Sequence, residues 1–218
     1  MKKLLLVCLS AVVLLASCVK KKDVVTGEAH VRIVNAIPNS IAQDVYIGSG
    51  KVTPSAGLFY PNATPYYSYT AGINLIGITN TGTTVSNLTF SYASEIGDYS
   101  TVFFLRGLTG ILSAGGIKDD MTAPPTGKAR VRFLNAQSYL NDSFTMSVAG
   151  GSSLFTSIIF STATPYYTVD PGTKFTATAT TITTPVTIDF NPQAGKIYTV
   201  WVGGGSDKEL IGNAILQN

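Results

Sequence analysis

Apolar and polar residues alternate with a period of two along much of the chain. In the first clear example, Val31 and Ile33 fall on one face, and His30 and Arg32 fall on the other. Successive side chains of an extended strand point to opposite faces of its sheet, so this alternation predicts a strand with one buried face and one solvated face. We therefore expect a chain built from half-buried strands.

The opening stretch returns one hundred residues later. Residues 26–36 read TGEAHVRIVNA and residues 126–136 read TGKARVRFLNA, while Ala-Thr-Pro-Tyr-Tyr occurs at both 63–67 and 163–167. A repeat of this length indicates a structural unit that has been duplicated within the chain. A chain of 218 residues divided in this way gives two domains of ordinary size.

Each copy contains about seven short alternating stretches separated by turn residues roughly every 8–12 positions, which is the pattern of a β-sandwich. After the tyrosine doublet, the alignment places Leu75 and Gly77 on one face with Phe175 and Ala177 of the second copy. Helix-forming residues are scarce, and Thr, Tyr, Val, Ile, Phe and Gly dominate.

The predicted fold is all-β, with two tandem immunoglobulin-like β-sandwich domains after a lipoprotein signal peptide. The expected boundaries are 1–17 for the signal peptide, 18–26 for the lipidated cysteine and tether, 27–120 for the first domain, 121–126 for a Pro-containing linker and 127–218 for the second domain.

The first 17 residues have the three-part layout of a secretory signal: Lys2-Lys3, an apolar run over 4–15, and the small residues Ala16-Ser17. The apolar run is shorter than the ~20 residues that a membrane-spanning helix needs. Cleavage of this segment is therefore expected, and it does not form part of the fold.

The motif Leu15-Ala16-Ser17-Cys18 resembles the lipobox of bacterial lipoproteins. Cys8 lies inside the leader, so Cys18 is the only thiol left after cleavage and no intramolecular disulfide can form. We expect Cys18 to carry diacylglycerol and an N-acyl chain such as palmitate. Several acyl chains anchor a protein stably to a membrane, whereas one is marginal.

The charge distribution excludes nucleic acid as an expected partner. The chain has fifteen Lys and Arg residues, and without Lys2 and Lys3 thirteen remain against twelve Asp and Glu residues. Nucleic-acid binding usually requires a dense basic surface that displaces counterions from phosphate. The mature chain is close to neutral and offers no such surface.

Aromatic residues recur on the face opposite the apparent core. In the last strong strand of the first copy Val102 and Phe104 share the core face and Phe103 points away from it, as Trp201 does in the second copy. An outward ring offers a large contact area with few rotors to freeze, which suits a sugar ring or a protein surface. Sandwiches also commonly cover such rings with loops or a neighbouring domain, which is the competing interpretation.

Each copy also carries a tyrosine doublet after its shared proline. Adjacent side chains of a strand point to opposite faces, so one tyrosine of each doublet should be buried and the other exposed, and the sequence leaves open which. The candidate ligand-contact residues are Tyr66, Tyr67, Phe103, Tyr166, Tyr167 and Trp201.

Residues suited to catalysis or metal binding do not recur in both copies. His30 is the single histidine and corresponds to Arg130, while the acidic pair Asp119-Asp120 corresponds to Gln217-Asn218. We interpret the acidic pair as a solvated entrance to the linker. No catalytic residue, metal ligand or cofactor site is predicted.

Asn35 and Asn135 end the first strand of each copy on the parity of the core residues. A short amide side chain at a turn usually bonds nearby backbone, and this interpretation is preferred to ligand binding.

Both copies resemble the bacterial family named domain of unknown function 4397, whose members open with an Ala-Arg-Val-Arg-like strand that ends in Asn-Ala. The run Asp44-Val45-Tyr46-Ile47 and the Gly97 turn fit that pattern, whereas Gln137-Ser138 and Ser143-Phe144 of the second copy depart from it. The resemblance implies immunoglobulin-like sandwiches on secreted or surface-anchored proteins and brings no catalytic residues. With the lipobox, it implies a lipoprotein of the Bacteroidetes kind.

We therefore expect a lipoprotein of the cell envelope, at the outer membrane, that acts as a non-catalytic binding or adhesion module for a glycan or a surface protein. Its expected partners are the membrane, through the lipid anchor, and that ligand. A passive spacer or assembly component is the alternative, and a hydrolase ranks third. The sequence leaves both the periplasmic and the surface-exposed side of the membrane open.

Overall fold

The computed structural model describes residues 26–140 and 143–218. The predicted signal peptide, Cys18 and most of the predicted tether lie outside these residues. Every regular element of the described part is a β-strand, so the all-β prediction is confirmed. A search of the same residues for a helix of sufficient length and apolarity to cross a bilayer finds none.

The first unit is a sandwich of two four-stranded sheets. The inner sheet has the order β4 (Tyr67–Thr70), β1 (Glu28–Ala36), β7 (Tyr99–Arg106) and β8 (Leu112–Lys118). The outer sheet has the order β3 (Gly50–Lys51), β2 (Gln43–Ile47), β5 (Gly72–Asn80) and β6 (Ser86–Ser94). Strands β1 and β7 run parallel, and their neighbours pair antiparallel.

The second unit repeats this topology. Its inner sheet has the order β12 (Tyr167–Val169), β9 (Ala129–Asn135), β15 (Ile197–Gly203) and β16 (Ile211–Leu216). Its outer sheet has the order β11 (Ser153–Ile158), β10 (Phe144–Val148), β13 (Phe175–Ala179) and β14 (Ile182–Ile188). Strands β9 and β15 are again the parallel pair.

The described residues of each unit hold eight strands, one more than the sequence predicts. The first unit's extra strand is explained by β3, which is only two residues long and too short to show alternation. The sheets divide the strands four and four, whereas constant-type immunoglobulin domains divide seven strands four and three. The predicted class, two tandem β-sandwiches, is confirmed, and each sandwich has four strands in each sheet.

The core of each sandwich contains residues that the alternation assigns to a buried face. Val31 and Ile33 of β1 pack with Val102 and Phe104 of β7 between the two sheets of the first unit. In the second unit a separate cluster forms around Phe133 and the corresponding strands. Two independent cores explain why the sequence pattern repeats at domain length.

Strand β5 is shifted by one residue from the alignment that the sequence predicts. Ile76 and Ile78 lie in the core, whereas Leu75 is 54% exposed on the other face. Side chains on one face of a strand are two residues apart, so a one-residue shift exchanges the faces. The prediction that Leu75 and Gly77 share a face with the core residues of the second copy is wrong, because the isoleucine pair buries more apolar surface.

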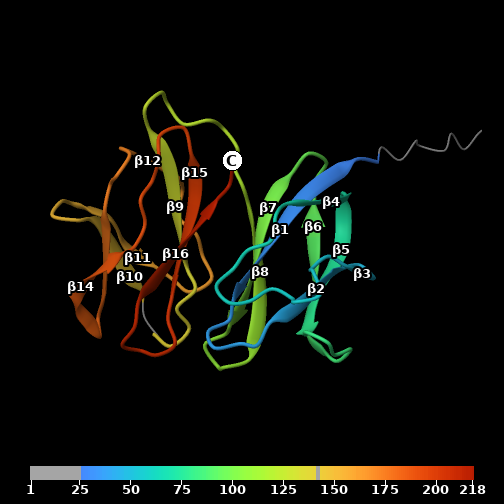
Figure 1. Cartoon of the computed structure of the whole chain (residues 1–218). Helices are drawn as coiled ribbons and strands as arrows, with labels where there is room; N and C mark the ends of the chain where they lie inside the picture. Colours follow the sequence, from blue (N-terminus) through green and yellow to red (C-terminus); the bar gives the residue numbers. More distant parts are fainter. Residues whose placement is uncertain (1–25, 141–142) are drawn as a thin grey trace, which may run out of the picture.

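The two units pack against each other through their inner sheets (Figure 1), and a third apolar cluster fills the layer between them. This inter-unit layer contains Val34, Ala36, Phe103 and Leu105 of the first unit and Leu134, Ala136, Trp201 and Ile215 of the second. The molecule is therefore a stack of four sheets, in which the sheets of β2 and β10 are outermost.

The inter-unit layer also buries the polar face of each first strand. Arg32 and Arg132 are both buried, although their alternation with apolar residues predicts a solvated face. That prediction is wrong because a period of two distinguishes one face from the other but not water from a second sheet that offers polar partners.

Candidate functional site

Phe103 and Trp201 have no surface exposed to solvent in the structure, at 0% each. They point away from the core of their own unit, as predicted, and meet in the inter-unit layer. Tyr60 of the first unit packs edge-on against Trp201 with ring centroids 5.8 Å apart. The expectation of an exposed aromatic platform is corrected for these rings, because each unit covers the aromatic residue of the other.

All four tyrosines of the two doublets are half-buried. The hydroxyl of Tyr66 donates to Asp119 over 2.7 Å, and that of Tyr166 donates to Gln217 over 2.7 Å, so the first tyrosine of each doublet faces the other unit. Tyr167 packs on the core of the second unit beside Phe133. The expected split between one buried and one exposed tyrosine is therefore wrong for both doublets.

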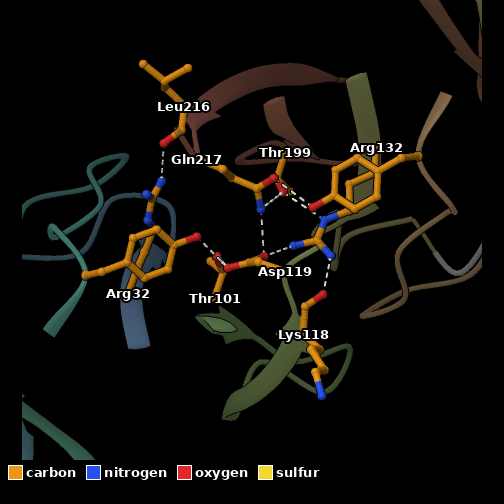
Figure 2. Close-up of polar contacts among 10 residues, drawn as sticks. Arg32, Thr101, Lys118, Asp119, Arg132, Thr199, Leu216 and Gln217 are labelled. Atoms are coloured by element: carbon orange, nitrogen blue, oxygen red, sulfur yellow. Dashed lines mark hydrogen bonds and ion pairs between the residues drawn. The ribbon is translucent and has the colours of Figure 1, made fainter. Parts of the chain in front are cut away.

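A buried polar network joins the units around Asp119 (Figure 2). Its carboxylate forms an ion pair with Arg132 of β9 and accepts hydrogen bonds from Thr101 over 2.7 Å and Gln217 over 2.6 Å. Burial together with the neighbouring Asp119 carboxylate raises the pKa of the Tyr66 hydroxyl. The prediction that Asp119 is solvated is wrong, because strand β8 carries it into the inter-unit layer.

The network follows the internal repeat. Arg132 donates to the backbone carbonyl of Lys118 over 2.7 Å, and Arg32 donates to the backbone carbonyl of Leu216, which ends the corresponding strand of the other unit. The guanidinium groups also stack on tyrosine rings, 4.1 Å from the Tyr66 centroid for Arg32. The units therefore contact each other as two copies do across a two-fold axis.

The acidic side chains near the linker each form an ion pair with a basic side chain. A hollow of about 540 Å³ beside the linker is lined in part by Asp98, Lys118, Asp119 and Asp120. Asp98 pairs with Lys118 at 2.5 Å, and Asp120 pairs with Arg130 at 2.5 Å. No group of three metal-ligating acidic, histidine or cysteine residues occurs among the residues that the structure describes.

His30 lies near the start of β1, a central strand of the inner sheet. Its ring stacks on Tyr99 with centroids 4.3 Å apart, and Nδ1 is 3.1 Å from the Ser68 hydroxyl. A serine and a histidine alone do not make a nucleophile, because the base also needs an orienting group and the reaction an oxyanion site.

The prediction for Asn35 and Asn135 is confirmed. Each side-chain carbonyl accepts the backbone N–H two residues later, over 3.1 Å in the first unit and 2.8 Å in the second. Each amide also donates to a backbone carbonyl across the unit, that of Leu58 or Ile158. These amides fix the end of the first strand.

The outer sheet of the first unit carries a shallow depression of about 340 Å³. Gly77 and Thr79 of β5 line it and are buried. Tyr46 of β2, which is half-buried, and Leu75 of β5, which is exposed, lie beside them. The other lining residues are Gly48, Ile78, Thr84, Ser86 and Thr89.

The depression exists because Gly77 lacks a side chain at the centre of this face. The pairing of β2, β5 and β6 sets Gly77 between Tyr46 and Thr89. A Cβ atom at Gly77 would lie 2.9 Å from the hydroxyl of Thr89. Any larger residue would therefore fill the space that the neighbouring side chains leave open.

The second unit carries different residues at the matching positions. Thr176 stands where the first unit has Gly77, opposite Ser147 instead of a tyrosine. Lys174 replaces Leu75, because the backbone carbonyl of each accepts the N–H of the residue directly after the paired strand, Gly48 after β2 and Ala149 after β10. The outer faces of two otherwise similar units thus differ in their exposed chemistry.

Sequence reasoning missed the depression because it assigned the face of Leu75 incorrectly. The available signal was the choice between two registers in the run Leu75-Ile76-Gly77-Ile78. One register buries two β-branched residues and the other buries a leucine and a glycine, and the first removes more apolar area from water.

The family model described as a domain of unknown function (DUF4397) matches residues 29–141, which span the first unit, the linker and the start of the second unit. No curated protein sequence matches the chain. A crystal structure of the family 26 carbohydrate-binding module CBMbc of Amy13K from Eubacterium rectale, in complex with maltoheptaose, aligns over 87% of this chain and 96% of that chain. The identity is 11% and the TM-score 0.24, values that carry no inference about a ligand of this chain.

Proposed function

The chain belongs to the family of the domain of unknown function 4397, and from this premise we propose that it is a non-catalytic binding module of the cell envelope. The inner faces of both units are occupied by the contact between them. A ligand would therefore bind to an outer surface. The exposed side chains of the first unit's outer sheet make that sheet the preferred candidate.

The observation that supports this surface is the contrast between the two outer sheets. Ile73 and Leu75 of β5 are 78% and 54% exposed, beside a depression with the dimensions of a small ligand site. The second unit has a lysine at the position of Leu75 and a threonine that fills the position of Gly77. Exposed apolar side chains beside a concave surface are typical of interaction sites.

We also propose that Cys18 is the lipid attachment site and that the tether after it holds the two units at a membrane, the outer membrane of the envelope. The support is the lipobox-like motif in the sequence. Replacement Cys18→Ala should abolish incorporation of labelled fatty acid and release the protein from the membrane fraction. Unchanged membrane retention would contradict the proposed anchor.

A passive spacer is the second candidate function. The buried network and the apolar inter-unit layer favour it, because they turn two domains into one stiff body that could hold another component away from the membrane. A spacer requires no specific side chains on the outer sheet. Replacement of those side chains therefore separates the two functions.

The test uses the chain from Val19 onward in two assays. The labelled chain is applied to a glycan array, and the immobilised chain is exposed to extracted envelope proteins. Leu75→Lys introduces the residue of the second unit and should abolish capture of any ligand that the parent binds. Lys174→Ala changes the matching position of the second unit and should leave capture unchanged. Equal capture by the parent and Leu75→Lys would place the binding surface elsewhere.

A further inference from the structure

We propose that the depression on the outer sheet of the first unit is a binding site for an uncharged glycan, an inference that rests on the binding function proposed above. Among the described residues, the site combines an apolar surface, a buried hydroxyl group without a hydrogen-bond partner, and a lining without charged side chains. Each of these features restricts the class of ligand.

The apolar part of the site suits the flat C–H face of a sugar ring. Tyr46 and Leu75 stand next to Gly77, whose missing side chain allows a ring to approach the backbone of β5. Aromatic side chains bury a large apolar area and keep a polar tip that can bond to a hydroxyl group. A purely polar ligand would leave this apolar area in contact with water.

The polar part of the site requires a hydrogen-bonding ligand. The Thr79 side chain lines the depression and is 7% exposed, and its hydroxyl oxygen has no hydrogen-bond partner among the described residues. A buried polar group without a hydrogen-bond partner destabilises the structure, because its hydrogen bond to water is lost and not replaced. A ligand hydroxyl group that bonds to Thr79 would remove this destabilisation.

Further hydroxyl groups lie at the edge of the depression. Thr84, Ser86 and Thr89 are exposed, and Ser86 and Thr89 bond to each other over 3.0 Å. A hydroxyl group can donate and accept, so these residues complement a ligand that carries several hydroxyl groups of its own.

The charges near the site neutralise each other. Asp44 and Lys51 of the neighbouring strands form an ion pair at 2.8 Å, and Asp44 also accepts hydrogen bonds from Thr81 and Gly82. Neither charge is left to pair with an ionised ligand. The electrostatics therefore favour a neutral sugar over an acidic or amino sugar.

The experiment is isothermal titration of the chain from Val19 onward with neutral oligosaccharides and with uronic-acid oligosaccharides of equal length. We expect binding of at least one neutral series and at least tenfold weaker binding of its acidic counterpart. Gly77→Thr, which copies the second unit, should weaken binding at least tenfold. Thr79→Val should weaken it about fivefold, the usual net effect of one hydrogen bond.

Thr178→Val is the matched control, because Thr178 occupies the position of Thr79 in the second unit. It should leave the affinity unchanged, and thermal unfolding should confirm that each variant is folded. If Gly77→Thr does not fold, Tyr46→Ala replaces it, with an expected loss of at least fivefold.

The outcomes separate this inference from the proposed function. Absence of neutral glycan binding, with protein capture that Leu75→Lys abolishes, would overturn the glycan inference and leave the binding surface in place. Stronger binding of acidic glycans would also overturn it. Neutral glycan binding that survives Gly77→Thr, Thr79→Val and Leu75→Lys would overturn both.

Discussion

Arg32 and Arg132 occupy the same position of the repeat, yet among residues 26–140 and 143–218 a carboxylate pairs only with Arg132. Asp119 forms the ion pair with Arg132, whereas the matching residue of the second unit is Gln217. Burial lowers the pKa of the Arg32 guanidinium, which rests on the Tyr66 ring and a backbone carbonyl instead. The two copies have thus diverged at this position, and Asp119 forms the buried ion pair of the inter-unit layer.

Replacement Asp119→Ala should therefore be strongly destabilising. It leaves the Arg132 guanidinium buried without its charge partner, and breaking a buried ion pair in this way costs about 3–5 kcal/mol of the free energy of unfolding. Urea denaturation provides the measurement. Asp120→Asn is the control, because the Asp120 side chain is half exposed and its pair with Arg130 should contribute no more than about 1 kcal/mol. Equal effects of the two changes would contradict the buried network.

Asp120 should also contribute a small acid-dependent term to stability. Hydrogen bonds from Arg130 and Thr122 hold the pKa of the Asp120 carboxyl below its ordinary value. A carboxyl whose pKa is lowered by folding stabilises the protein above its unfolded-state pKa, near 4, and loses this contribution as the pH falls through the folded-state value. In unfolding measured from pH 7 to pH 2, the difference in stability between the parent and Asp120→Asn should begin to shrink below about pH 4 and continue to shrink toward pH 2. A difference that grows toward low pH would contradict this assignment.

At the scale of elements, the alternation correctly predicts strands, the sandwich class and most core positions. It fails at β5, where Leu75 and Ile76 are both apolar and the register is ambiguous. It also fails for Arg32 and Phe103, because a face covered by another unit carries the same pattern as a face toward solvent or ligand. The candidate site was consequently missed, since it depends on both the register of β5 and the contact between units.

The register of β5 predicts a large loss of stability for truncation of Ile76 and almost none for truncation of its neighbour Leu75. Ile76→Ala removes a fully buried side chain and should lower the free energy of unfolding by about 2–5 kcal/mol. Leu75→Ala changes an exposed residue and should have an effect within about 0.5 kcal/mol. Chemical denaturation of both variants checks the assignment. A larger loss of stability for Leu75→Ala than for Ile76→Ala would contradict this register and support the predicted alignment, in which Leu75 faces the core.

At the scale of the whole molecule, the duplication behaves as a pair of subunits within one chain. Apolar residues and a polar network from both units fill the layer between them, so the linker is not the main connection. We predict that a protease site inserted between Ala123 and Pro124 can be cut without separating the units. Size-exclusion chromatography after cleavage should show one particle of unchanged volume that contains both fragments. Separate elution of the fragments would contradict this packing.

We expect the ligand to bind on the outer sheet of the first unit. Hydrogen exchange of the chain from Val19 onward, measured with and without a ligand found by the array or capture assays, tests this location. Strands β2 and β5 should gain protection over 43–47 and 72–80, while the matching strands β10 and β13 should remain unchanged. Protection confined to the second unit, or to the inner sheets, would contradict this location.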